Sequence, residues 1–376
     1  MPGTVSDVRT PADIDPELAE RLRKSAVSTA VTGEPDLETL AALRKSGLLA
    51  TAVPRAYGGH GGDASDINRI CERLAHLNPS LAIMVFQHFA VSARIAEWGS
   101  AEQKDTLLPA LADGTALAAS AWSEQGAGAA KRNLSSTAVR KDDGTWVLDG
   151  AKSFTTTASV ADLYLVLVRT GDLAEDKDGG YGAAGQTFFL VRAENPGLAP
   201  DLSLDLVGMR GSATGFVSLR GCVVTDADRL GPEGRARQII AGVRESGASL
   251  GAIAVGVAQA ALEELTGHLE RRGQLASPLA RTRLVDMATR VESARAIVGR
   301  AGARASADPG TTTLHSKLHA STVAEEVCLE AVRMLGSSGY TTASALNRLL
   351  ADARAVALMG PANDLCRELV ASTWPK

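Results

Sequence analysis

Apolar residues recur at helical spacing in the two ends of the chain, and they alternate with polar residues only in its middle. In the first third this spacing predicts helices over 17–30, 37–49, 66–77, 81–98 and 101–111, with Ser80 as the N-cap of the very apolar helix 81–98. In the last third it predicts helices over 237–271, 279–305, 312–335, 345–358 and 361–372. Long helices of this kind, lying side by side, are typical of a bundle.

The middle of the chain, from about residue 115 to 230, carries the signal of β-strands. We expect strands at 134–140, 145–148, 153–157, 161–168, 187–191 and 215–219. The turn Asp142-Asp143-Gly144 predicts a hairpin between the first two. The glycine-rich and charged segment 171–185 predicts an exposed loop.

These patterns predict an α+β fold that is mainly helical, in three domains. The boundaries that we expect are 1–114 for an N-terminal helical domain, 115–232 for a middle β-sheet domain and 233–376 for a C-terminal helical bundle. Residues 2–16 are expected to form a loose leader without the basic and apolar regions of a secretory signal.

Segment 120–158 concentrates the residues that suit a planar cofactor. It holds two aromatic residues, Trp122 and Phe154, and the hydroxyl donors Ser123, Thr155, Thr156 and Thr157. A sheet with these side chains offers a flat apolar face beside short donors. The alternative is that both aromatic rings only fill the core of the sheet.

Composition narrows the class of protein further. The chain has 376 residues, of which 45% are hydrophobic and 22% charged, and its net charge of −4 gives no case for binding nucleic acid or an anionic membrane. No run approaches the length of about eighteen apolar residues that a membrane span requires. The four cysteines are far apart, which indicates buried free thiols in a reducing cytoplasm.

Standard catalytic motifs are missing from the sequence. It has no phosphate-binding loop of the GxxxxGKS type, no GxGxxG opening a strand-turn-helix unit, no HExxH and no GxSxG. His315 and His319 have the spacing of a metal pair, but without a third ligand nearby we expect a solvated helix face and no metal. For His88, within MVFQHFAV, the default expectation is a buried core histidine.

Seven motifs in the right order show a resemblance to the acyl-CoA dehydrogenase family of flavoproteins over nearly the whole chain. The segment at 122–129 reads WSEQGAGA and is similar to the family's TEPxAGSD, and 150–158 reads GAKSFTTTA and is similar to GxKxWITNA. VGMRGSATGF and RMLGSSGYT also resemble family motifs, at 207–216 and 333–341. The resemblance implies the three-domain fold, FAD between the sheet and the C-terminal bundle, and a homodimer or homotetramer in which a neighbouring subunit completes the site.

The same resemblance implies which residues contact FAD. Trp122 and Ser123 match positions whose backbone and hydroxyl meet the isoalloxazine, and Phe154 and Thr156 match those at its other edge. Such donors and a flat face are what a flavin needs in order to accept hydride. Arg272 matches an arginine that reaches the pyrophosphate, with a surface charge as the alternative. The glycine turn that lets a backbone approach the cofactor is matched by Gly336 and Gly339.

The chain departs from the family pattern at two kinds of position, those that contact the cofactor phosphates and the one that holds the catalytic base. Ala129-Ala130 replaces the family's Ser-Asp, which removes one phosphate-facing hydroxyl. Met359 stands where most members have the catalytic glutamate, and a thioether takes no proton. Some members carry the base on the first long C-terminal helix, and Glu245 lies near that place, one residue off in an ungapped alignment. Glu245 is therefore the candidate base; the alternative is a glutamate that complements a helix dipole.

Three functions remain open from the sequence. The first is a dehydrogenase for an acyl thioester on coenzyme A or an acyl carrier protein, in a specialised biosynthetic pathway and with a flavin-type electron acceptor. The second is a flavin-dependent monooxygenase of the same fold, because loss of the glutamate at Met359 suits it equally. The third is a non-catalytic member that only binds an acyl group or a partner.

Overall fold

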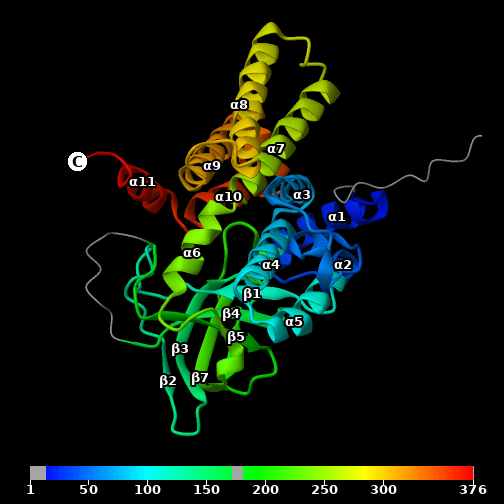
Figure 1. Cartoon of the computed structure of the whole chain (residues 1–376). Coiled ribbons are helices and arrows are strands. Elements are labelled where there is room, and N and C mark those ends of the chain that lie inside the picture. The colour runs from blue at the N-terminus through cyan, green and yellow to red at the C-terminus, as the bar shows by residue number, and fades with distance from the viewer. Residues whose placement is uncertain (1–13, 172–180, 376) are drawn as a thin grey trace, which may run out of the picture.

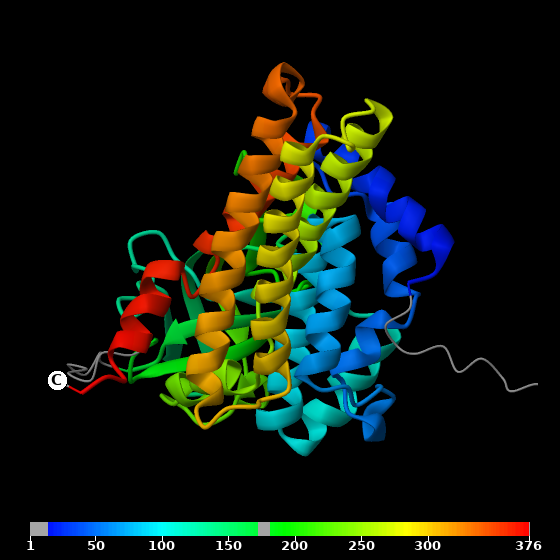
Figure 2. The same ribbon diagram turned by 90° about the horizontal axis from the view of Figure 1, so that it is seen from above.

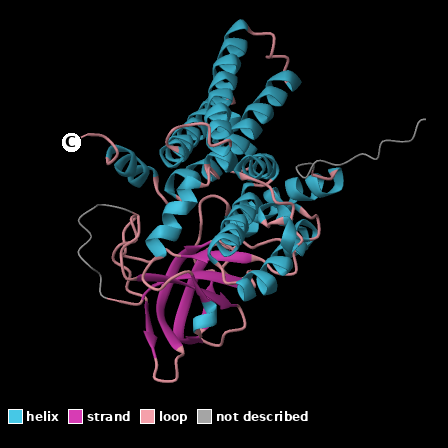
Figure 3. Ribbon diagram, viewed as in Figure 1, coloured by secondary structure: helices cyan, strands magenta, loops and turns pink. Residues whose placement is uncertain are grey.

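The computed structural model describes residues 14–171 and 181–375. Helices form both ends of the chain and a single sheet forms its middle, so the predicted fold class is confirmed (Figure 1). Figure 3 shows the strands gathered into one body, with the helices packed beside and above it. The expected leader 2–16 and most of the expected loop 171–185 lie outside the described residues.

The N-terminal part contains α1 (Pro16–Thr32), α2 (Leu37–Arg44), α3 (Ala64–Leu77), α4 (Pro79–Trp98) and α5 (Ala101–Asp113), with 3-10 turns η1 (Leu48–Ala52) and η2 (Arg55–Tyr57). Two expectations were wrong in detail. Helix α2 ends early, because Gly47 adopts a left-handed conformation and a 3-10 turn follows. The N-cap of α4 is Asn78, whose side chain accepts a hydrogen bond from the Leu81 N–H at 3.1 Å, and Ser80 lies inside the helix.

Within the described residues the sheet has eight strands: β1 (Ala118–Ala121), β2 (Thr137–Arg140), β3 (Trp146–Thr155), β4 (Leu163–Arg169), β5 (Gln186–Arg192), β6 (Leu198–Asp201), β7 (Gly215–Val224) and β8 (Arg229–Leu230). The predicted hairpin is confirmed, because β2 and β3 pair antiparallel with Thr137 opposite Asp149. The segments 145–148 and 153–157 were expected to be separate strands. One strand, β3, contains most of both segments and ends at Thr155, and its pairing with β7 shifts register between Leu148 and Gly150.

The end of the expected loop 171–185 is not exposed, which corrects the prediction there. Tyr181 and Ala183 are buried, with exposed fractions of 8% and 3%. The Ala183 N–H donates to Gln186 Oε1 at 3.0 Å, and the Gly182 N–H donates to the Ala130 carbonyl at 2.8 Å. These bonds hold the entry to β5 against the glycine-rich turn after β1.

The C-terminal part contains α6 (Ala236–Glu245), α7 (Gly251–Arg271), α8 (Pro278–Gly302), α9 (Pro309–Met334), α10 (Ala345–Leu358) and α11 (Asn363–Ala371). The single helix predicted over 237–271 is two helices. Gly247 breaks it with φ +88°, and a Cβ there would lie 2.3 Å from the Ala301 carbonyl oxygen. Viewed from above, α7, α8 and α9 run side by side as a bundle (Figure 2).

Burial agrees with the sequence expectations for the thiols and the histidines. All four cysteines are free and buried. His88 is fully buried, and burial lowers its pKa to about 4. His315 and His319 are exposed on α9, and among the described residues no cluster of metal-ligating side chains occurs. None of the helices in the described ranges is long and apolar enough to cross a membrane.

A buried ion pair ties the turn after β1 to β3. Lys152 Nζ lies 2.5 Å from Glu124 Oε1, and the two side chains are 0% and 2% exposed. Glu124 Oε2 also accepts hydrogen bonds from the Ser135 N–H and hydroxyl at 2.6 and 2.7 Å. Burial by itself would raise the pKa of Glu124, but Lys152 and the serine donors hold that pKa below its usual value. Burial lowers the pKa of Lys152 to about 8, against the opposing effect of Glu124.

A second buried carboxylate joins the C-terminal bundle to the sheet domain. Asp352 on α10 accepts a hydrogen bond from the Met209 N–H at 2.5 Å, next to the 3-10 turn η3 (Arg210–Ser212). Burial raises the pKa of Asp352 to about 6, although the Met209 bond and Arg348 act in the opposite direction. This contact links α10 to the loop before η3.

We predict that Glu124→Gln destabilises the protein, because it leaves the Lys152 ammonium buried without its counter-charge. Removing one partner of such a pair costs about 3–5 kcal/mol. The double variant Glu124→Gln/Lys152→Met should recover most of this loss. Thermal unfolding of the three proteins is the measurement, and an unchanged melting temperature in the single variant would contradict the prediction.

We predict that Asp352→Asn makes stability less dependent on pH. The folded pKa of Asp352, about 6, lies above the value of about 3.9 in an unfolded chain, so folding takes up a proton. The resulting stabilisation is complete below pH ~4 and is lost as the pH rises through 6, an effect of about 2–3 kcal/mol.

Melting temperatures at pH 5 and pH 7.5 test this prediction. The advantage of Asp352→Asn over the native chain should be larger at pH 7.5. Asp286→Asn, at an exposed position on α8, should change neither value. An equal difference at both pH values would show that Asp352 is ionised alike in the folded and unfolded states.

Candidate active site

Four of the predicted cofactor residues lie together at the ends of β1 and β3. Trp122 and Ser123 follow β1 directly, Phe154 lies near the end of β3, and Thr156 comes just after it. The Ser153 N–H donates to the Ser123 carbonyl at 2.8 Å, which joins the two segments. The structure therefore assembles these residues at one corner of the sheet.

The hydroxyls of Ser123 and Thr156 accept hydrogen bonds from neighbouring side chains and keep their own hydrogens. Ser123 Oγ accepts a hydrogen bond from Lys131 Nζ at 2.6 Å, and Thr156 Oγ1 accepts one from Thr214 Oγ1 at 3.2 Å. A hydroxyl has one hydrogen and two acceptor lone pairs, so each keeps its own O–H to donate elsewhere. Each hydroxyl can therefore still donate to a ligand at this corner.

The two aromatic side chains occupy different environments. Phe154 is 61% exposed and has φ +51°, a strained conformation for a residue with a Cβ, so its ring is not part of the sheet core. Trp122 is half-buried and packs on Phe188 with ring centroids 4.9 Å apart. Its buried Nε1 has no hydrogen-bond partner among the described residues. Phe154 is therefore not a core residue, whereas Trp122 packs against the buried cluster that contains Phe188.

The other predicted cofactor residues lie elsewhere in the chain. Arg272 is exposed at the end of α7, in the α7–α8 hairpin that projects from the molecule (Figure 1). Gly336 and Gly339 lie in the 3-10 turn η5 (Gly336–Tyr340), which packs on α9 and α10. Gly336 has φ +62°, and a Cβ on Gly339 would lie 2.3 Å from the Val332 carbonyl oxygen. Both elements belong to the helical part of the chain, whereas Ser123 follows strand β1 of the sheet.

Glu245 ends α6 and is exposed. Its carboxylate lies against the first turn of α9, where a Cβ on Gly310 would be 2.5 Å from Oε1. This position beside a helix N-terminus suits a negative charge. Met359, at the end of α10, is half-buried against the helical core.

Sequence reasoning missed Lys131, the residue after Ala129-Ala130. Its side chain is buried, and the ammonium lies 5.6 Å from the centre of the Tyr181 ring. Burial lowers the pKa of Lys131 to about 8; Lys152 acts in the same direction and Glu124 against it. The signal in the sequence was a lysine directly after a glycine-rich turn in a segment expected to touch a cofactor.

A second missed lysine holds the turn after Met359. Lys317 on α9 is buried, and its Nζ lies 2.5 Å from the Pro361 carbonyl oxygen and 3.1 Å from Asn363 Oδ1. Burial lowers the pKa of Lys317 to about 8. Its hydrogen bonds fix the backbone that follows the position of the family's glutamate.

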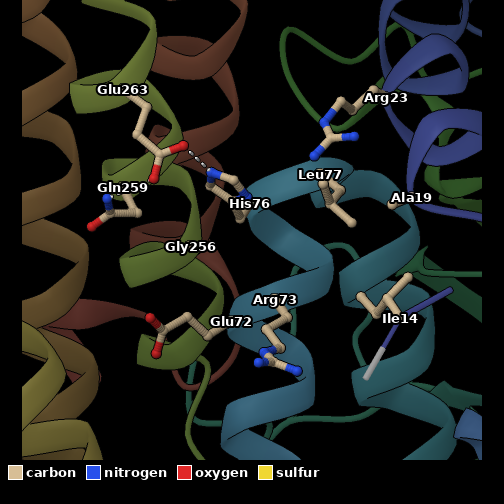
Figure 4. A pocket seen from close by; sticks show the side chains of 10 residues that line it. All are labelled: Ile14, Ala19, Arg23, Glu72, Arg73, His76, Leu77, Gly256, Gln259 and Glu263. Carbon is tan, nitrogen blue, oxygen red and sulfur yellow. Dashed lines mark hydrogen bonds and ion pairs between the residues drawn. The ribbon is translucent and has the colours of Figure 1, made fainter. Parts of the chain in front are cut away.

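A separate cavity of about 420 Å³ lies between α1, α3 and α7 (Figure 4). His76 Nε2 and Glu263 Oε2 are 2.8 Å apart at its edge. It contains none of the residues predicted for the cofactor. Its lining residues are Ile14, Ala19, Arg23, Glu72, Arg73, His76, Leu77, Gly256, Gln259 and Glu263.

Family models match all three parts of the chain. Residues 15–115 match the acyl-CoA dehydrogenase N-terminal domain, residues 119–222 the middle domain and residues 236–373 the C-terminal domain. The fold is similar to that of butyryl-CoA dehydrogenase from Megasphaera elsdenii, with a TM-score of 0.84 at 24% identity, covering 96% of this chain and 99% of the other.

Two relatives with stated activities are similar over most of the chain. Cyclohexane-1-carbonyl-CoA dehydrogenase of Geobacter metallireducens is 30% identical, covering 94% of this chain and 93% of the relative. L-prolyl-[peptidyl-carrier protein] dehydrogenase of Pseudomonas fluorescens is 31% identical, covering 87% of each. The chain belongs to the acyl-CoA dehydrogenase family, and it is therefore an FAD-dependent flavoprotein oxidoreductase.

Proposed function

We propose that the protein dehydrogenates an acyl thioester by removal of an α-proton and transfer of a β-hydride to FAD. The observation that supports this proposal is the corner formed by Ser123, Phe154 and Thr156, where two hydroxyls keep a hydrogen to donate and the Phe154 side chain is exposed. FAD supplies the hydride acceptor when it is bound. The chain's own task is to hold the flat ring, exclude water and take the proton.

The carrier of the acyl group is proposed as coenzyme A or an acyl carrier protein. One relative is named for a coenzyme A thioester and another for a peptidyl carrier protein, at nearly equal identity. The altered motifs around Ala129 and Met359 support a specialised, biosynthetic substrate. A flavin-type electron acceptor and a cytoplasmic location complete this proposal.

Glu245 is our proposed base. Met359 offers no proton acceptor, and Glu245 is a carboxylate at the junction of α6 and α7, near the place where some family members carry the base. The competing explanation is that Glu245 stabilises the N-terminus of α9 through Gly310. The two explanations predict different phenotypes for one substitution.

We further propose that the FAD site is shared between copies of the chain. Arg272 lies in the projecting α7–α8 hairpin and Gly336 and Gly339 lie in η5, outside the sheet that carries Ser123, which supports a second copy as their source. A homodimer or homotetramer would supply such a copy. The domain boundaries that we propose are 1–114, 115–232 and 233–376.

Met359 also favours a second candidate, a flavin-dependent monooxygenase of the same fold. Such an enzyme uses flavin reduced by another protein and needs no base for an α-proton. A non-catalytic acyl-binding member is the third candidate. Reduction of the flavin by substrate separates the three.

We predict that the purified protein is yellow and that an acyl thioester bleaches its flavin band without oxygen. Cyclic and linear acyl-coenzyme A esters and a prolyl carrier protein are the probes, and the absorbance of oxidised flavin is the readout. Bleaching only by an external reductase, with an oxygenated product in air, would support the monooxygenase. Failure to retain FAD, even when FAD is supplied, would support the non-catalytic member.

We predict that Glu245→Gln lowers the rate of bleaching by about 10²–10⁴-fold, the usual contribution of a general base, and retains FAD. Glu264→Gln, at an exposed position on α7, is the matched control and should react like the native chain. If Glu245 only stabilises the N-terminus of α9, its substitution will lower the melting temperature slightly and leave the rate of flavin bleaching unchanged.

A further inference from the structure

Lys131 is a buried cation without a counter-ion of its own. Its side chain belongs to a residue that is 6% exposed, and it makes no ion pair with any described residue. The carboxylate that raises the pKa of Lys131 is Glu124, which is already paired with Lys152. The buried group of Glu124, Lys152 and Lys131 therefore carries one net positive charge.

The backbone of Lys131 is held from two sides. Its carbonyl accepts a hydrogen bond from Gln186 Nε2 at 2.7 Å, and its N–H donates to the Gly128 carbonyl at 3.2 Å. It adopts φ +53°, which costs energy for a residue with a Cβ. The loop thus fixes the direction of this side chain rather than leaving it free to reach water.

The ammonium lies between the two walls of the candidate site. On the sheet side it donates to Ser123 Oγ at 2.6 Å. On the helical side it faces the turn after Met359, where a Cβ on Gly360 would lie 3.5 Å from Nζ. Because Ser123 accepts from a cation, its own O–H becomes a stronger donor toward whatever occupies the site.

An unpaired buried charge is costly, so the site favours a ligand that brings a negative charge. The proposed reaction creates such a charge. The substrate loses a proton to the base and a hydride from Cβ, and the hydride delivers two electrons and one proton to FAD. Until a second proton arrives, the reduced ring carries one more negative charge than the oxidised ring.

We propose that Lys131 is a positioning residue that, through Ser123, stabilises reduced FAD relative to oxidised FAD. This inference rests on the proposed function, since it requires FAD at the corner formed by Ser123, Phe154 and Thr156. The Lys131 ammonium would not touch the flavin; it would change the reduction potential of FAD through its hydrogen bond to the Ser123 hydroxyl. The electrons then leave to the external acceptor, and the ring returns to its oxidised state.

The test is the reduction potential of bound FAD, measured by equilibration with a dye of known potential. Lys131→Met and Lys131→Gln remove the charge, and Lys131→Arg keeps it. Lys141→Met, at an exposed lysine in the β2–β3 turn, is the control. We expect Met and Gln to weaken the preference for reduced over oxidised FAD at least tenfold, which is about 30 mV for a two-electron couple. Arg and the control should stay near the native potential.

Several outcomes would overturn the inference. Equal potentials in the native, Met and Gln proteins would remove Lys131 from flavin tuning, while bleaching of the native protein by a thioester would leave the proposed function standing. A potential that falls in Lys131→Arg as far as in Lys131→Met would show that the shape of the side chain, and not its charge, sets the potential. A native protein that retains no FAD would overturn both proposals together. Removing Lys131 orphans no other charge, so we expect all variants to fold, and the Gln variant repeats the test independently of Met.

Discussion

The ion pair between Glu124 and Lys152 decides where the candidate flavin platform lies. Glu124 follows Ser123, and Lys152 precedes Phe154 by two residues, so pairing of the two charges places their neighbours at one corner of the sheet. Both side chains are removed from water, and each is therefore stable only with a complete set of partners. The donors of Ser135 and the carbonyl of Leu167 complete that set. The platform depends on this pair more than on the hydrogen bonds of its own hydroxyls.

The loop at Met209 and the turn at Pro361 are held by contacts between parts of the chain that are distant in sequence. Asp352 holds the loop at Met209, and Lys317 holds the turn at Pro361. Neither contact touches the proposed ligand positions, yet each fixes an element beside them. The remaining predicted cofactor residues lie elsewhere, in the α7–α8 hairpin and in η5, outside the sheet that carries Ser123.

The departures from the family pattern change the charge of the site as well as its shape. Ala129 and Ala130 remove polar groups from the glycine-rich turn, and Lys131 follows with a buried ammonium. On the opposite side, Met359 replaces a carboxylate by a neutral thioether. Relative to the family pattern, both changes remove negative charge or add positive charge, and Lys131 does so in contact with Ser123. A more positive site favours an anionic ligand, so the two departures would change the affinity for such a ligand in the same direction.

The sequence by itself determined the class of the fold, the order of its three parts and the candidate platform. Helical and alternating spacings reflect which face of an element is buried, and that local property survives in a single sequence. Seven ordered motifs then identified the family. The sequence also predicted buried thiols and a buried His88, because apolar surroundings are visible in the neighbouring residues.

Only the tertiary structure decided how charges are paired. Glu124 and Lys152 are 28 residues apart and look like ordinary surface charges in the sequence, and Lys131 looks like one more. Their burial follows from strands that meet at long range, which periodicity does not encode. The same holds for the break between α6 and α7 at Gly247, where the Ala301 carbonyl of α8 approaches closely. Residues whose role depends on a distant partner become visible only when the chain is folded.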